Sequence, residues 1–84
     1  MKKETLDKLD INERARVRSV EPLSPMYRRL LDLGFVRGST VECVGKSPSG
    51  DPSAYLVRGA VIALRSEDAR GIEVSFCEEL EVEN

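Results

Sequence analysis

The chain has 84 residues, with 13 Lys and Arg against 15 Asp and Glu, two cysteines and no histidine. A chain of this length forms one domain with one small core, which leaves little interior for a deep substrate pocket. The lack of histidine excludes any Ser-His-Asp or Cys-His catalytic arrangement. The net charge of −2 argues against a nucleic-acid partner, because nucleic-acid-binding domains are usually strongly basic.

The apolar segments are too short for membrane insertion. The longest uninterrupted run, Ala60–Leu64, is far below the roughly 20 residues that a membrane helix needs. The lysines near the N-terminus precede no apolar stretch, so we expect no signal peptide and a cytoplasmic protein. Two cysteines are too few for a disulfide framework, and whether Cys43 and Cys77 lie close together stays open.

The first half of the chain begins with a polar segment, residues 1–12, whose few apolar residues form either a frayed helical turn or a tail that docks on the core. From Glu13 to Val20, charged residues alternate with smaller or apolar ones, the period-two pattern of a half-buried strand. The pattern predicts that Ala15, Val17 and Ser19 point to one face.

A short helix is predicted over about Pro25–Leu33. Serine at position 24 can cap the first free amides, and proline suits the first helical turn. Gly34 then supplies the left-handed turn that ends the helix. Apolar residues at helical spacing form a buried stripe with a second line beside it: Met26, Leu30 and Leu33, then Tyr27 and Leu31.

The second half contains closely spaced short strands. They are predicted at Thr40–Lys46, Ala54–Arg58, Ala60–Arg65 and Ile72–Phe76, with a hairpin around Gly59 and a helical turn near Glu67–Arg70 that Ser66 caps. The fold class is therefore mainly β: a small SH3-like β-barrel of about five strands, closed or nearly closed, with one inserted helix. The core covers about residues 13–76 of a single domain, 1–84, and residues 77–84 form an acidic tail.

The residues that could carry chemistry point to binding rather than catalysis. Cys43 lies in a strand pattern and is interpreted as an inert core thiol. A metal site from Cys77, Glu78 and Glu79, with a role as iron carrier, is a minor alternative. Gly45-Lys46-Ser47 resembles the end of a P-loop, but the glycine that the motif needs earlier is Thr40 here.

Three groups of residues carry a resemblance to a known family. They are Leu33-Gly34-Phe35-x-x-Gly38, then Pro48-x-Gly50-Asp51-Pro52, then Ile62-Ala63-Leu64-Arg65 followed by Asp68-Ala69 and Ile72. In this order and spacing they closely resemble the FeoA family, small cytosolic partners of a bacterial ferrous-iron transporter. The resemblance covers roughly residues 13–76.

The resemblance implies an SH3-like barrel and a non-enzymatic accessory or regulatory role in bacterial ferrous-iron uptake. The implied partner is the cytosolic GTPase region of the membrane transporter FeoB. No catalytic residue, cofactor or metal ligand is carried over, although transition-metal binding is suggested at the level of the family. Because the same barrel resembles the C-terminal domain of iron-dependent repressors, an alternative is an SH3-like protein-interaction domain in iron-dependent transcriptional regulation.

The candidate partner contacts are Tyr27, Arg28 and Leu31 on the helix, with Asp51 and Tyr55 near the Pro/Gly loop. Partly exposed apolar residues on a helix often mark a contact surface, but Tyr27 and Leu31 could equally belong to the core. A basic patch for an acidic partner, built from Arg16, Arg18, Arg28 and Arg29, is weighed against ordinary surface charge. Weak homo-oligomers stay open, and no direct membrane insertion is expected.

Overall fold

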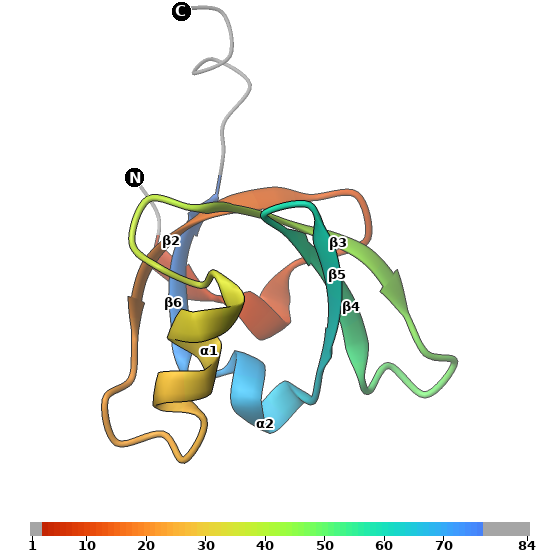
Figure 1. Cartoon of the computed structure of the whole chain (residues 1–84). Helices are drawn as coiled ribbons and strands as arrows, with labels where there is room; N and C mark the ends of the chain where they lie inside the picture. The colour runs from red at the N-terminus through yellow and green to blue at the C-terminus, as the bar shows by residue number, and fades with distance from the viewer. Residues whose placement is uncertain (1–2, 77–84) are drawn as a thin grey trace, which may run out of the picture.

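The computed structural model describes residues 3–76, which form one antiparallel β-sheet and several short helices (Figure 1). The elements in chain order are β1 (Lys3–Thr5), the 3-10 helix η1 (Leu6–Lys8), β2 (Arg14–Val20), α1 (Tyr27–Leu33), β3 (Thr40–Lys46), β4 (Ser53–Val57), β5 (Ala60–Leu64), α2 (Ser66–Ala69) and β6 (Ile72–Phe76). The predicted mainly β class with one inserted helix is confirmed.

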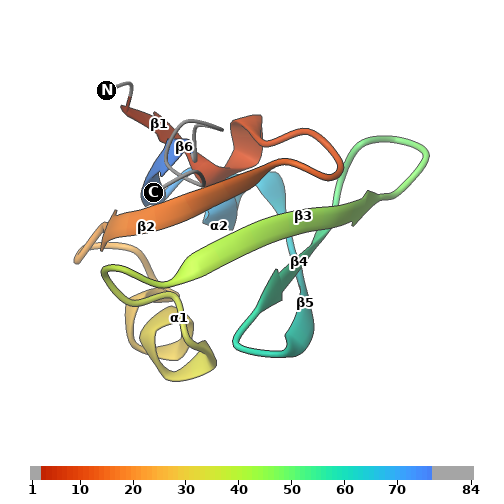
Figure 2. The same cartoon turned by 90° about the horizontal axis from the view of Figure 1, so that it is seen from above.

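The sheet has six strands in the order β1-β6-β2-β3-β4-β5, so β1 and β5 are its two edges and do not pair with each other. The prediction of a closed or nearly closed barrel of about five strands is therefore wrong in two respects. The N-terminal segment adds a sixth strand, and the sheet stays open. The short helices η1 and α2, which contact each other, lie between the two edge strands (Figures 1 and 2).

The core lies inside the curved sheet and uses residues from both ends of the described chain. Tyr55 and Phe35 are its largest fully buried side chains, and Cys43 is completely buried among apolar neighbours. Leu6 and Leu9 are also fully buried, whereas Ile11 stays 47% exposed. Both interpretations of the N-terminal segment hold in part: η1 is a short helical turn, and Leu6 and Leu9 dock on the core.

Strand β2 departs from strict alternation. Ala15 and Val17 face the core as predicted, but Ser19 is exposed and Val20 is buried in its place. The pairing with β6 shifts register between Val17 and Ser19, which marks a β-bulge. One extra residue in a strand moves the following side chains to the opposite face, so the prediction for Ser19 is wrong.

Helix α1 ends where the sequence predicts but begins two residues later than the predicted Pro25. Met26 and not Ser24 is at the N-cap, and no side chain caps the helix. The Met26 N–H donates to Ser24 Oγ at 3.1 Å just before the first helical turn. Gly34 ends the helix in the left-handed region at φ 115°, and Phe35 N–H donates to the Leu30 carbonyl at 3.0 Å. That bond turns the chain back at the end of α1, and the Phe35 side chain that follows is fully buried in the core.

The predicted hairpin around Gly59 is confirmed as a two-residue turn between β4 and β5. Arg58 and Gly59 both have positive φ, 53° and 81°, and Val57 pairs with Ala60 across the turn. These are the features of a type I′ turn, whose twist matches that of the strands. The acidic tail and Cys77 lie outside the described residues.

Replacing Gly34 with alanine should lower the free energy of unfolding by about 1–2 kcal/mol, because a side chain resists the left-handed conformation. The added Cβ would also lie 2.8 Å from Cδ of Arg58, which would have to move. Urea denaturation measures the effect. Gly45→Ala is the matched control, because its Cβ would meet only Ala54 Cβ at 3.9 Å; equal stability of the two variants would contradict the assigned role.

Candidate partner-binding surfaces

The first candidate surface is the outer side of α1, which carries three of the five predicted contact residues. Leu30 is fully buried and anchors the helix to the core. Tyr27 and Leu31 pack against that core but remain only half-buried, and Arg28 is exposed. Since residues three and four apart share a helix face, these three side chains border one continuous surface. Tyr27 and Leu31 thus belong partly to the core and partly to the surface.

Asp51 has a structural contact at the other end of the sheet. It is exposed in the loop between β3 and β4, and its Oδ1 accepts a hydrogen bond of 2.9 Å from the Ser66 N–H. Ser66 is the first residue of α2, and Arg65 before it makes no side-chain cap. The prediction that Ser66 caps this helical turn is therefore wrong. The cap comes from Asp51, fifteen residues earlier.

Tyr55 does not belong to any surface. Its side chain is only 1% exposed, because β4 directs it into the core opposite Cys43 on β3. The hydroxyl donates to the Leu6 carbonyl at 3.5 Å. Burial raises the pKa of Tyr55 above its ordinary value of 10.0. The prediction of Tyr55 as an exposed partner contact is therefore corrected: Tyr55 is a core residue, and its hydrogen bond links β4 to the N-terminal segment.

The predicted contact residues do not form one site. Figures 1 and 2 both show the loop between β3 and β4 far from α1, at the opposite end of the sheet. Tyr27, Arg28 and Leu31 are brought together by the helix, whereas Asp51 stands apart from them. Only the α1 surface therefore retains the composition predicted for a contact site.

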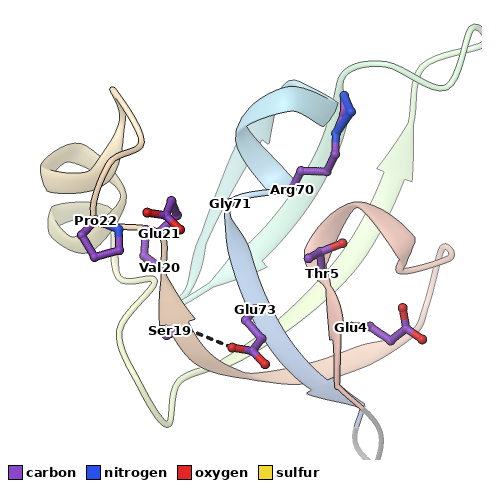
Figure 3. Close-up of a pocket in the computed structure, with 9 residues that line it drawn as sticks. All are labelled: Glu4, Thr5, Ser19, Val20, Glu21, Pro22, Arg70, Gly71 and Glu73. Atoms are coloured by element: carbon purple, nitrogen blue, oxygen red, sulfur yellow. Dashed lines mark hydrogen bonds between the residues drawn. The ribbon is translucent and has the colours of Figure 1, made fainter.

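A shallow groove lies where the end of β2 meets the start of β6 (Figure 3). It has a volume of about 610 Å³, and its lining includes Glu4, Glu21, Glu73 and Arg70. Two of these carboxylates hold local structure: Glu73 Oε1 accepts from Ser19 Oγ at 3.2 Å, and Glu21 Oε2 accepts from the Leu23 N–H at 3.0 Å. Figure 3 shows that the acidic groups do not converge on one point, so the groove offers no catalytic or ligand-binding constellation.

Leu23 is a surface feature that the sequence interpretation missed. It is 89% exposed, in the turn between β2 and α1, and lines a second hollow that shares Glu21, Arg70 and Gly71 with the groove. A leucine between two prolines in a predicted break was the available signal, since neither neighbouring element could bury it. A single exposed leucine is ordinary on a protein surface and by itself indicates no site.

The described residues also limit the chemistry of these surfaces. Within residues 3–76, no group of three or more His, Cys, Asp or Glu side chains could hold a metal ion. Cys43 is fully buried, with its Sγ 3.7 Å from the Gly45 carbonyl. No helix in the same range is long and apolar enough to cross a membrane.

Residues 3–76 thus form an open antiparallel sheet around one small core. The FeoA domain family matches residues 4–75 of this chain. A fusion of Fe(2+) transport protein A with the transporter FeoB, from Porphyromonas gingivalis, is 36% identical over 71 residues. That match covers 84% of this chain and 8% of the relative.

Solved structures agree with this assignment. The FeoA-like protein from Clostridium acetobutylicum has a TM-score of 0.86 and 34% identity, covering 94% of this chain and 92% of its own. FeoA from Stenotrophomonas maltophilia, solved with zinc and described as a prokaryotic SH3 domain protein, has a TM-score of 0.77 and 37% identity, covering 84% and 88%. The chain belongs to the FeoA family, and its fold is SH3-like. Manganese-dependent transcriptional repressors share the fold at 17% identity, a likeness that shows the fold alone.

Asp51→Ala should lower the free energy of unfolding by about 1 kcal/mol, because the Ser66 N–H loses its acceptor. It should also speed hydrogen exchange at the Ser66 amide. Asp51→Asn keeps an oxygen at the same place and serves as the matched control. Unchanged stability and exchange in the alanine variant would show that the contact contributes nothing to α2.

Alkaline pH should destabilise the protein through Tyr55. Because its pKa is raised in the folded state, the folded protein holds this proton more tightly than the unfolded chain does. The contribution to stability is therefore complete below pH 10.0 and is lost as the pH rises above that value towards the folded pKa. Tyr55→Phe should remove this component of the fall in unfolding free energy, measured by urea denaturation at a series of pH values. Tyr27→Phe should leave it in place; an unchanged pH dependence in Tyr55→Phe would contradict the account.

Proposed function

We propose that this protein is a cytosolic, non-enzymatic accessory factor of bacterial ferrous-iron uptake that binds the GTPase region of the transporter FeoB. The observation that carries the proposal is the relative in which a segment 36% identical to this chain is part of a protein that also comprises FeoB. Fusion of two modules in one chain holds each at a high effective concentration near the other. This supports a functional contact between the two proteins when they are separate chains.

The surface proposed for this contact is the outer side of α1. Tyr27 and Leu31 offer partly exposed apolar area, and Arg28 beside them offers a charge. Aromatic and arginine side chains at the centre of an interface often supply most of its binding energy. Leu30 fixes the helix from the inside, so the surface is presented on a rigid element.

In this proposal the protein acts on its partner by binding to it and catalyses no reaction. A bound protein shifts its partner between two conformations only by the difference in its affinity for them. An accessory factor of this kind would therefore raise or lower transport activity by favouring one conformation of the GTPase region. The transcriptional alternative gains no support from this structure, since the likeness to repressors lies at the level of the fold.

The proposal predicts a charge-specific effect on α1. Arg28→Glu should weaken binding to the purified GTPase region of the same organism's transporter by about tenfold, or 1.4 kcal/mol. Isothermal titration calorimetry measures the dissociation constant. Arg29→Glu is the matched control, because Arg29 is also exposed but points to a different side of the helix from Tyr27 and Leu31. Equal weakening by both variants would show that net charge, and not this surface, determines binding.

A further inference from the structure

Strand β5 is an open sheet edge without the usual protection. It is the last strand in the sheet order, and in residues 3–76 no strand pairs with its outer side. Its five residues, Ala60–Leu64, contain neither a charge nor a proline. Its pairing with β4 has no register shift, whereas the pairing of β2 with β6 and that of β3 with β4 each have one. Natural edges are commonly protected by lysine, proline or a bulge, and β5 has none of these.

The turn geometry shows which backbone groups this edge presents. In a two-residue hairpin the residues that flank the turn, Val57 and Ala60, form a hydrogen-bonded pair, and such pairs alternate along the strands. Ala60, Ile62 and Leu64 therefore bond to β4, whereas the N–H and C=O groups of Val61 and Ala63 point away from it. None of the turn, loop or cap hydrogen bonds recorded in residues 3–76 uses these outward groups.

The side chains beside this edge are apolar although they face solvent. Val61 is 63% exposed and lies opposite Leu56 on β4. Ala63 is exposed and lies opposite Ala54. The solvent side of an antiparallel sheet is normally polar. Apolar residues there, next to unpaired backbone groups, are typical of a surface that another strand covers.

The charges around β5 select the occupant. Arg58 precedes the strand and Arg65 follows it, both exposed, and β5 itself carries no Asp or Glu; the acidic residues closest in sequence, Asp51 and Glu67, lie on the Arg65 side, where Asp51 accepts from the Ser66 N–H. A second copy pairing antiparallel through its own β5 would bring arginines together at both ends, which like-charge repulsion disfavours. An extended segment with apolar residues in its middle and acidic residues at its ends would instead complement both arginines.

We propose that β5 binds an extended, acid-flanked segment of the transporter's cytosolic region as a seventh strand of the sheet. This inference rests on the proposed function and adds a second contact to it. The two surfaces approach each other at the β4–β5 turn: a Cβ on Gly34, which follows α1, would lie 2.8 Å from the Arg58 side chain in that turn. One partner can therefore cover the outer side of α1 and the edge of β5 together.

The test is hydrogen exchange of the Val61 and Ala63 amides in the full chain, alone and saturated with the purified GTPase region. Binding should slow both amides at least about tenfold, because an added strand accepts hydrogen bonds from them. Protection of these amides in the free chain would overturn the proposal. Protection that increased with protein concentration would assign the edge to a second copy of the chain. Protection independent of concentration would assign it to residues 78–83, which read Glu-Glu-Leu-Glu-Val-Glu.

Two variants at Val61 separate the backbone contact from the side chain. Val61→Pro removes an N–H that points away from β4, so the hairpin keeps its own bonds, and binding should weaken about tenfold or more. Val61→Thr keeps the N–H and the branched shape, and its affinity should stay within about twofold. NMR fingerprint spectra verify the fold of both.

The outcomes distinguish this inference from the function on which it rests. Tight binding without protection of Val61 and Ala63, and without an effect of Val61→Pro, would overturn the edge contact and leave the accessory role standing. No binding of the wild-type chain at millimolar partner would overturn both. Arg65→Gln should bind the partner more weakly, and high salt should weaken binding of the wild-type chain in the same way. Both results together would support acidic residues at the ends of the bound segment.

Discussion

The structure depends on one constraint: a chain of 84 residues can fill only one small core. Tyr55, Phe35, Leu30 and the two leucines of the N-terminal segment are all fully or almost fully buried in that core. Further apolar residues, such as Met26, Leu33 and Ile62, are partly buried and pack against this core. The groove between β2 and β6 is shallow, and two of its carboxylates hold the local structure.

The open sheet follows from how that core is completed. Leu6 in η1 and Ala69 in α2 are both fully buried, and these two short helices contact each other between the edge strands. A closed barrel would have no free edge, whereas this arrangement leaves β5 accessible beside the arginines of its two turns. The same packing fixes α1 through Leu30 next to the β4–β5 turn. The end of α1 thus lies next to the turn from which β5 begins.

Local signals in the sequence predicted the parts of this fold that local physics determines. Gly34 ends α1 and Gly59 turns the hairpin because few other residues adopt positive φ easily. The bulge after Val17, the strand β1 and the failure of the sheet to close depend on how distant segments pack, which periodicity cannot show. The candidate contacts divide in the same way: Tyr27, Arg28 and Leu31 share a surface because of helix geometry, whereas the burial of Tyr55 and the exposure of Leu23 arise only in the assembled fold.

The most direct test of the central claim, that this chain acts through its surface on a transporter's GTPase region, is an NMR titration of the labelled full chain with that region. The account predicts amide shifts confined to α1 and β5, with the methyl signals of core residues such as Leu30, Val57 and Ile72 unchanged because these side chains are buried away from the contact. Absence of any shift at millimolar partner, or shifts spread evenly through the core methyl groups, would contradict it.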